Sequence, residues 1–497
     1  FFSAINALDA SGIDCIDPNP RRITEKLGSS AAHIYGKEIC FSETFGGFGW
    51  SLTTEDMKRR VDLQYVQGVN ALVPHAFFYS TDGIRKTESP PSLFVQNGYW
   101  KYFRQFADYA KRLSYICRNG NFIADAAVYF PVKTAWAEYR PLYRFFLQGL
   151  DEQVLTITEE LNRNGISFDF IDDNGLDKCR VADKALVGIE KSAYKAVILP
   201  SVTVIPEKTL VKIKDFVLGG GVVISAGKFE PTDETGERSE EFVFTLNELK
   251  NSDNYAEIKK HREDEILPVI KSVINGEIVS GDADGVFTLK RTDGDTEIRF
   301  FVNADDKEKS FTVRQNGEYS AEIMNAENGD IFPADFARKN GDTEVKIVLR
   351  PFASVIVAFT DENLKPVRRK REKLSEDITF GWTVAGEDKT VEKADFFSAG
   401  KERFSGEVTF VKRINVSNPT GKIVLRAENV TDYASLSVNG DFTGARLWSP
   451  FEFDLTGKLR CGENEIALTI GSTEENAMTD GNKNAGVFGK IGIFEVK

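Results

Sequence analysis

The stretch "EICFSETFGGFGWSLTTEDMKRRVDLQYVQGVNALVPHAFFYS", residues 38–80, decides the fold because a strand, a helix and a second strand follow one another in it. The first strand runs into glycines and carries one carboxylate, Glu43, where it stops. The helix begins behind Thr53 or Thr54, either of which can cap it, and stops at Gly68. The second strand is "NALVPHAFFYS". Such a unit predicts two parallel strands joined by a helix.

The same alternation continues on both sides of this stretch. "GIDCID" is a short apolar strand, and a helix is expected over about residues 20–35. A long amphipathic helix is expected over 97–119, with aromatic and alanine side chains along one face. Three consecutive βα units predict a parallel sheet, either open or closed into a barrel.

A second α/β pattern covers residues 122–228. Its strands are "FIADAAVYFP", "ISFDFID", "YKAVILP" and "GGGVVISAG", and helices are expected over 141–164 and 206–218. This order predicts a small doubly wound, flavodoxin-like sheet. The Gly219–Gly221 run precedes its strand, so a helix C-cap is favoured over a phosphate loop. Residues 229–275 are highly charged and are expected to form a solvated, helical or loop-like excursion.

The second half of the chain has the period of β-strands. Alternating strands parted by Asp-Gly, Asn-Gly and Gly-Asp turns predict a small β-sandwich that ends near residue 360. The basic run over residues 361–377 is expected to be a solvated linker. The short strands after it predict a larger β-sandwich. The predicted domain boundaries are therefore 1–120, 121–275, 276–360, 361–377 (linker) and 378–497.

Composition narrows the class of protein. The 497 residues are 41% hydrophobic and 28% charged, which is typical of a globular protein with several domains. A net charge of −13 argues against a nucleic-acid or anionic membrane partner, and no apolar run is long enough for a transmembrane helix. Five scattered cysteines and three histidines argue against a zinc site. His33, in the first helix, is expected to be structural.

The region from Tyr433 to the end of "NEIALTIGST" resembles the galactose-binding-like jelly roll of glycoside hydrolase family 2 and its relatives. The motifs that carry the resemblance are Val438-Asn439-Gly440, Trp448, Pro450-Phe451 and Gly462-Glu463-Asn464. Trp448 either covers the core or stacks on a sugar face, and the core position is favoured.

The opening third resembles the last part of the catalytic barrel of the family 106 α-L-rhamnosidases. "GIDCID", "SSAAHIYGKEICFSETFG", the helix and strand of residues 52–80, and "NGYWKYFRQFADYAKRLSYICRNGNFIADAAVYFP" carry this resemblance. The order of the later domains also looks like that group. A (β/α)8 barrel needs about 250 residues, and only three units are visible here. We therefore expect an N-terminally truncated chain, because it also starts without Met.

Glycoside hydrolysis needs two carboxylic groups, and barrel enzymes place them at the carboxyl ends of strands. Glu43 has such a position, so the sequence predicts that it is one catalytic carboxylate. The resemblance implies a nucleophile, acid, base or metal ligand at this place. The alternative is a glutamate that caps a loop or pairs with Arg or Lys. The second acid is expected on strands outside this chain.

Five further residues are candidates for substrate binding. His75 and Tyr79 follow the strand after Glu43, and Trp50 follows the glycine-rich loop, where it could form a platform for a sugar ring. Asp14 and Asp17 bracket the end of the first strand. A backbone-satisfied histidine, a packed tryptophan and turn or cap aspartates are the alternatives.

The sequence thus predicts a rhamnosidase-like glycosidase that acts on plant or microbial polysaccharide or oligosaccharide. No organic cofactor is expected, and calcium is implied by the resemblance alone. The alternatives are a non-catalytic carbohydrate-binding protein and an inactive fragment of such an enzyme. Oligomeric state and compartment stay open, and a secreted or periplasmic location is compatible with polysaccharide degradation.

Overall fold

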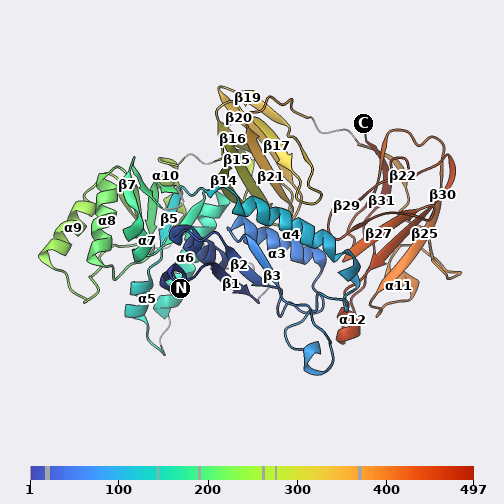
Figure 1. Cartoon of the computed structure of the whole chain (residues 1–497), viewed down its shortest axis with the longest axis horizontal. Coiled ribbons are helices and arrows are strands. Elements are labelled where there is room, and N and C mark those ends of the chain that lie inside the picture. The colour runs from blue at the N-terminus through green and yellow to red at the C-terminus, as the bar shows by residue number, and fades with distance from the viewer. Residues whose placement is uncertain are drawn as a thin grey trace.

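The computed structural model describes residues 2–16, 23–142, 145–188, 192–259, 263–274, 277–367 and 372–496. The chain is a multidomain arrangement of helices and sheets. Parallel sheets with their helices occupy the first half, and antiparallel sheets dominate the second half (Figure 1).

The first sheet has three parallel strands in the order β1-β2-β3. One face lies against helices: Gln64 Nε2 donates to Ser42 Oγ at 3.0 Å and to Thr44 Oγ1 at 3.1 Å. The opposite face is open, and Phe41 (37% exposed) and Val73 (49% exposed) lie on it. The elements of this part are α1 (Phe2–Asn6), β1 (Ser11–Cys15), α2 (Thr24–Tyr35), β2 (Cys40–Thr44), α3 (Thr54–Val66), β3 (Ala71–Pro74), η1 (Gly83–Lys86), η2 (Gly98–Tyr102) and α4 (Phe103–Arg118).

The predicted start and end of the central helix are confirmed. Thr53 is the N-cap of α3: its hydroxyl accepts from the Asp56 N–H at 3.0 Å, and Asp56 Oδ2 accepts from the Thr53 N–H at 3.2 Å. This reciprocal pair is a capping box. Gly68, just beyond the helix, adopts φ 101°, which favours glycine and turns the chain into β3.

The expected helix over 97–119 is shorter than predicted. The 3₁₀ turn η2 occupies its first part, and α4 begins only at Phe103. Gly98, in η2, packs against the C-terminal sandwich, where a Cβ would lie 2.7 Å from the Tyr433 hydroxyl. This contact with a distant part of the chain was not visible in the local pattern.

The second sheet has five parallel strands in the order β12-β11-β10-β5-β6. The expected helix over 141–164 is α6, and the short α5 precedes it. The elements are β5 (Ala126–Tyr129), α5 (Val132–Glu138), α6 (Phe145–Arg163), β6 (Phe168–Ile171), α7 (Asp173–Lys178), β10 (Ala196–Leu199), α8 (Glu207–Leu218), β11 (Val222–Ala226), α9 (Glu240–Lys250), β12 (Tyr255–Ile258), η3 (Glu263–Glu265) and α10 (Ile266–Lys271), with a small antiparallel sheet of β7 (Arg180–Ala182), β8 (Ala185–Val187) and β9 (Ala193–Tyr194).

The prediction of a solvated excursion over 229–275 is wrong for a large part of this segment. Strand β12 extends the second sheet beside β11, and α9 buries Phe242 and Leu249 completely. The charged residues around these apolar side chains lie on the outer face of the helix and hid its buried face in the sequence.

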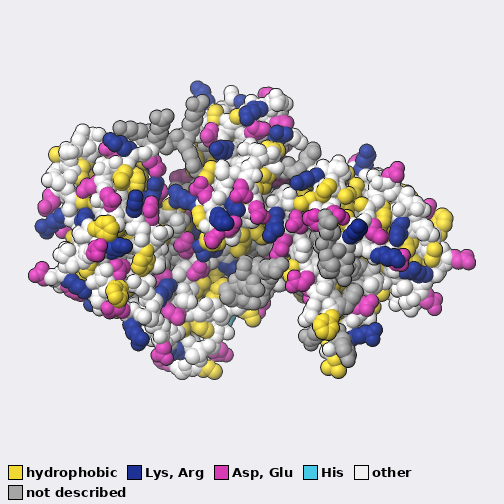
Figure 2. Space-filling view, turned by 180° about the vertical axis from the view of Figure 1, so that it is seen from behind, with side chains coloured by type: hydrophobic (Ala, Val, Ile, Leu, Met, Phe, Trp, Pro, Cys, Tyr) yellow, Lys and Arg dark blue, Asp and Glu magenta, His cyan; other side chains and the backbone are white. Residues whose placement is uncertain are grey.

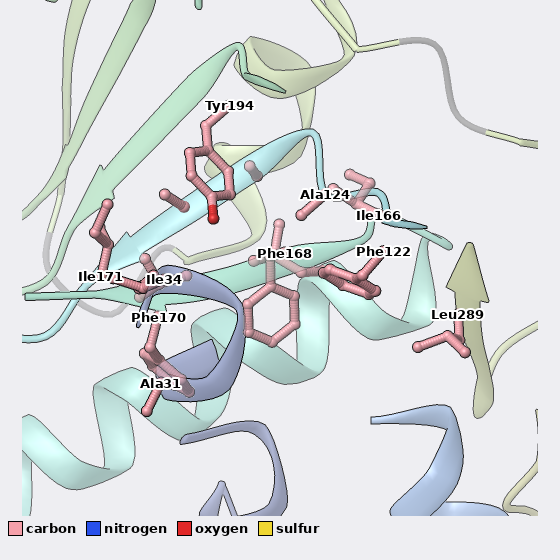
Figure 3. Close-up of a cluster of buried hydrophobic side chains, with 14 of the residues drawn as sticks. Ala31, Ile34, Phe122, Ala124, Ile166, Phe168, Phe170, Ile171, Tyr194 and Leu289 are labelled. Carbon is pink, nitrogen blue, oxygen red and sulfur yellow. The ribbon is translucent and has the colours of Figure 1, made fainter. Parts of the chain in front are cut away.

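The two parallel sheets are joined by a shared core. Ala31 and Ile34 of α2 pack against Phe168 and Phe170 of β6 (Figure 3). Helix α2 therefore covers both its own sheet and the edge strand of the second sheet.

The small β-sandwich takes one strand from outside its own sequence. Strand β4 (Asn121–Phe122) pairs with β14, where Phe122 lies opposite Arg291. The Arg291 guanidinium donates to the carbonyls of Asn119 and Gly120, both at 3.0 Å. The two sheets are β13-β16-β20-β19 and β18-β17-β21-β15-β14-β4. The other strands are β13 (Ile278–Asp282), β14 (Val286–Asp293), β15 (Thr296–Asn303), β16 (Lys309–Asn316), β17 (Ser320–Met324), β18 (Ile331–Pro333), β19 (Phe336–Lys339), β20 (Asp342–Leu349) and β21 (Ser354–Thr360).

The C-terminal sandwich has its own hydrophobic core, which runs from Ile378 to Ile493. Residues 372–377, which we expected in the linker, form β22 and pair with β31. The two sheets are β22-β31-β26-β29 and β24-β23-β25-β30-β27-β28. The elements are β22 (Glu372–Asp377), β23 (Trp382–Val384), β24 (Thr390–Val391), α11 (Phe396–Ala399), β25 (Glu407–Val416), β26 (Lys422–Ala427), β27 (Tyr433–Val438), β28 (Asp441–Arg446), β29 (Phe451–Asp454), β30 (Gly462–Gly471), α12 (Glu475–Met478) and β31 (Ile491–Val496).

Trp448 takes the buried position that the sequence favoured. Its side chain is 6% exposed, and its indole Nε1–H donates to Glu327 Oε1 at 3.1 Å. Its ring also contacts Tyr109 of α4, with 5.4 Å between centroids. Trp448 thus joins the C-terminal sandwich to the small sandwich and to α4.

Candidate active site

Glu43 lies on the open face of the first sheet, one residue before β2 ends. In the parallel register it stands between Asp14 of β1 and Val73 of β3. Side chains alternate between the faces of a strand, and Ser42 and Thr44 face the helices, so Glu43 turns away from them. Glu43 thus lies near the carboxyl end of a parallel strand, as the sequence predicted.

Asp14 is brought next to Glu43. The two residues are partners in the β1–β2 ladder, and both are exposed. Neighbouring strands lie about 4.8 Å apart, so two carboxylates share one patch of this face. Neither carboxylate forms a hydrogen bond or ion pair with any other residue that the structure describes, so the pairing of Glu43 with Arg or Lys is not found there. With respect to the described residues, both groups are therefore available to a ligand.

His75 lies at the same end of the sheet. It follows β3 directly, and its N–H donates to the Thr44 carbonyl at 2.8 Å. Its ring fills the space beside Gly46, where a Cβ would lie 3.1 Å from the imidazole. A side chain at position 46 would therefore displace the ring. Within the described part of the chain, His75 Nδ1 is buried without a hydrogen-bond partner.

One of the predicted binding residues, Trp50, is placed differently from the prediction. Trp50 is not an accessible platform: it is 2% exposed, and its Nε1–H donates to the Lys86 carbonyl at 2.8 Å. The chain turns at Gly47 and Gly49, both with positive φ, and carries the indole under the loop that follows β3. Tyr79 lies on that loop and is fully exposed. Asp17 lies outside the described residues.

A buried charged group supports the sheet from behind and was missed in the sequence. Arg60 of α3 reaches Glu25 of α2, with 3.1 Å between Nη2 and Oε1, and its Nε–H donates to Cys15 Sγ at 2.9 Å. Burial raises the pKa of the Cys15 thiol. Cys15 follows Asp14, so these contacts hold the end of β1. The sequence signal was an arginine on the apolar face of α3, between Met57 and Val61.

The described residues contain neither a cluster of metal-binding side chains nor a helix that could span a membrane. Among the described residues, no three His, Cys, Asp or Glu side chains gather closely enough to hold a metal ion. No helix in the described ranges has the length and apolar character needed to cross a bilayer. Acidic and basic side chains are mixed over the face seen from behind (Figure 2).

Comparisons with known proteins show the family and the fold of the chain. The family model for glycoside hydrolase family 106, α-L-rhamnosidase, matches residues 17–338, more than half of the chain. A rhamnosidase from Novosphingobium sp. PP1Y has the same fold, with a TM-score of 0.78 and 19% identity over 99% of this chain and 52% of that one. The cold-adapted β-galactosidase from Rahnella sp. R3 is more distant, with a TM-score of 0.50 and 13% identity over 72% of this chain and 61% of that one.

A curated relative matches in sequence as well. It comes from Formosa agariphila, bears the name "Putative beta-glucuronidase" and is 24% identical over 346 residues, which are 67% of this chain and 28% of that protein. The chain thus spans about half of the rhamnosidase of known structure and less than a third of this relative. On the family match, the chain belongs to glycoside hydrolase family 106, the α-L-rhamnosidases.

Proposed function

We propose that the protein hydrolyses glycosidic bonds as an α-L-rhamnosidase-type enzyme and that Glu43 is one of its catalytic carboxylates. The observation that carries this proposal is the exposed carboxylate of Glu43 at the carboxyl end of a parallel strand, beside Asp14 and at the same end as His75. Barrel enzymes build their active sites at this end of their strands. Family membership supports the reaction class.

The proposal assigns each side chain a role that suits its chemistry. Glu43 takes or gives a proton at the scissile bond, or attacks the anomeric carbon, and a second carboxylic acid performs the other half of the reaction. Asp14 accepts hydrogen bonds from substrate hydroxyls next to Glu43. The His75 ring, held by the Gly46 gap, hydrogen-bonds a sugar hydroxyl. Such a reaction uses no organic cofactor, and calcium stays a prediction from family resemblance.

We also propose which known fold each of the parallel sheets and the C-terminal sandwich belongs to. The three parallel strands form the last part of a (β/α)8 barrel, and the open face with Phe41 and Val73 is the barrel interior, which further strands would cover. The strand order of the second sheet matches the flavodoxin-like order 2-1-3-4-5 when read from β6. The two-sheet C-terminal unit is assigned as a jelly roll. We keep the predicted domain boundaries, except that residues 121–122 join the small sandwich as β4 and the linker ends before β22.

Substitution of Glu43 tests the proposal. Glu43→Gln keeps the size of the side chain and removes its charge and proton transfer. The test uses the whole product of the gene, here called the gene-encoded protein. In it, we expect the Glu43→Gln substitution to lower kcat/KM for an aryl α-L-rhamnoside by a factor of about 10² to 10⁴. Asp14→Asn serves as the comparison, and we expect it to raise KM more than it lowers kcat. Undiminished turnover by the Glu43→Gln enzyme would remove Glu43 from the mechanism.

An aryl glycoside panel determines the sugar. The enzyme should hydrolyse the α-L-rhamnoside faster than the corresponding β-glucuronide and β-galactoside. A preference for another sugar would keep the roles of the carboxylates and change the substrate assignment. Proton NMR of the first product anomer would show whether the configuration is retained or inverted.

One observation favours a second possibility, namely that the 497-residue chain by itself is an inactive part of such an enzyme. The apolar side chains of Phe41 and Val73 are exposed on the sheet face that also carries Glu43. A half-formed site of this kind is catalytically inactive alone. Comparing the turnover of the 497-residue chain with that of the gene-encoded protein distinguishes an incomplete enzyme from a complete one.

A further inference from the structure

A polar groove lies where three parts of the chain meet. It has a volume of about 600 Å³, which is in the range of binding sites for small molecules. Helix α4 forms one wall, the loop between β17 and β18 the second, and strand β28 with the segment after it the third. We call it the junction groove, and the side chains that matter here are Gln105, Arg112, Glu327, Lys422, Phe442 and Arg446.

The junction groove is separate from the candidate active site. Glu43 lies on the sheet face that turns away from α3, because Gln64 of α3 bonds to the neighbouring Ser42 and Thr44. Helix α4 packs on α3, and α3 and α4 lie between the first sheet and the small sandwich (Figure 1). The groove lies along α4, so two helices stand between it and Glu43.

The charges of the groove balance. Three carboxylates and three cationic side chains line it, so it has no net preference for an anion or a cation. A groove of this kind favours a neutral ligand with many hydroxyl groups, each of which can both donate and accept a hydrogen bond. The charged side chains are Asp108, Glu327, Glu452, Arg112, Lys422 and Arg446.

Phe442 supplies an exposed aromatic surface in the groove. Its side chain is 59% exposed on β28, while Trp448 nearby is buried and forms part of the wall. A side chain at Gly444, two residues on, would meet no atom within 4 Å, so the strand surface at this glycine is open. The apolar face of a pyranose ring stacks on such an aromatic surface.

Hydrogen-bonding groups line the same groove on the α4 wall. The Gln105 amide makes no hydrogen bond to another residue of the described ranges, and its side chain lines the groove. Arg112 is held in place because its Nη1 donates to the carbonyls of Ala326 and Glu327, at 3.0 and 2.9 Å. An amide and a fixed guanidinium can bind neighbouring sugar hydroxyls in pairs.

We propose that the junction groove binds a neutral oligosaccharide chain without cleaving it. Phe442 stacks on one sugar ring, and Gln105 and Arg112 bind hydroxyl groups beside it. The groove thereby holds a polymeric substrate at a distance from the catalytic carboxylates. This binding role does not depend on the role of Glu43.

Affinity electrophoresis tests the proposal. The gene-encoded protein with Glu43→Gln, which should not degrade the probe, is run in native gels that contain a galactan, an arabinan or a rhamnan, with polygalacturonate as the charged comparison. We expect at least one neutral polysaccharide to slow the protein. Adding Phe442→Ala should weaken the apparent Kd about tenfold, and Gln105→Ala should weaken it less. Phe397→Ala removes another exposed phenylalanine of the same sandwich, outside the groove, and should leave binding unchanged.

The outcomes separate this proposal from the proposed function. Phe442→Ala alone should leave kcat/KM for an aryl glycoside unchanged and lower turnover of the polymer. The proposal is wrong if no neutral polysaccharide slows the protein, if Phe442→Ala binds as well as Phe397→Ala, or if only polygalacturonate is bound. If the Glu43→Gln protein still cleaves glycosides, the proposed role of Glu43 fails, while the effect of Phe442→Ala on binding still decides the role of the groove.

Discussion

Asp169 is a fully buried carboxylate in β6, with partners from helix α2 and from strand β9 of the small antiparallel sheet. Its Oδ1 lies 3.0 Å from His33 Nδ1 and 3.7 Å from Lys26 Nζ, and the Tyr194 hydroxyl donates to Oδ2 at 3.0 Å. Burial by itself would raise the pKa of Asp169, but His33, Lys26 and Tyr194 outweigh it and hold this pKa below its usual value. The charged carboxylate therefore stabilises the folded state.

Replacing Asp169 by asparagine should make stability less dependent on pH. The folded pKa is lower than the unfolded value of about 3.9, so the stabilisation is fully present above about pH 4 and is lost as the pH falls further. We expect Asp169→Asn to lower the free energy of unfolding by about 3 kcal/mol at pH 7, because Lys26 and His33 lose their buried partner. Thermal melts between pH 3 and pH 7 should show this difference shrink below pH 4.

The exposed Asp253→Asn is the matched control, since no contact of comparable burial is lost there. A difference between wild type and Asp169→Asn that is the same at pH 3 and pH 7 would contradict the assignment of a lowered pKa to Asp169.

For single residues, the sequence predicted the place of a side chain better on helices and strands than on loops. The place of Glu43 followed from the period of two in β2, and Gly68 from the end of a helical pattern. Trp50 sits on a loop whose path depends on glycines with positive φ, so its burial could not be predicted. The contact of His33 with Asp169 spans 136 residues, and no local pattern contains it.

At the scale of single elements, the capping box of α3 links the stability of a helix to the loop behind Glu43. We expect Thr53→Ala to destabilise the first turn of α3 by about 1 kcal/mol, because the Asp56 N–H loses its acceptor. Hydrogen exchange of the amides of residues 54–57 should become faster by a factor of about five to ten. Thr53→Ser keeps the oxygen and should behave like the wild type. Equal exchange in the alanine and serine variants would show that the cap contributes nothing measurable.

Helices and strands with a strong hydrophobic period were predicted in the correct order along the chain. The elements that were predicted wrongly have physical reasons for it. Strands β1 and β2 and helix α3 lie where the pattern placed them, whereas β3 covers only the first part of the strand expected over 70–80. The segment over 229–275 was misjudged because a few buried residues such as Phe242 hold a charged helix to the sheet. The split of the 97–119 helix depends on a neighbour, Tyr433, that lies more than 300 residues away.

At the scale of the whole molecule, the open face of the first sheet makes a prediction about the isolated chain. Phe41 and Val73 are exposed there, so the 497-residue chain should bind the dye ANS. Phe41→Ser with Val73→Thr should lower that fluorescence about twofold without loss of stability. If further strands cover this face in the gene-encoded protein, the same pair should lower its melting temperature by several degrees. An unchanged melting temperature there would contradict a covered barrel interior.

The arrangement of the domains was the part that sequence patterns could not supply. Period and turn residues separate helical from strand-rich segments, but they did not reveal that β4 belongs to the small sandwich. Contacts between units, such as the Trp448–Glu327 hydrogen bond, depend on surfaces that only the folded units create. The junction groove is formed by three such surfaces and has no counterpart in any one stretch of sequence.

The pairing of β4 with β14 limits how this chain can be divided. Residues 121–122 precede the second parallel sheet, yet they complete a sheet of the small sandwich, and Gly120 lies so close to Thr292 that no side chain fits between them. A gene fragment for residues 276–360 would therefore encode a sandwich with a missing edge strand. Recombination that exchanges the unit with the five-stranded parallel sheet must keep residues 121–122 together with the small sandwich. The boundary at residue 120 is therefore not a boundary of the fold, and an exchange of the chain from that point would take the edge strand β4 away from the small sandwich.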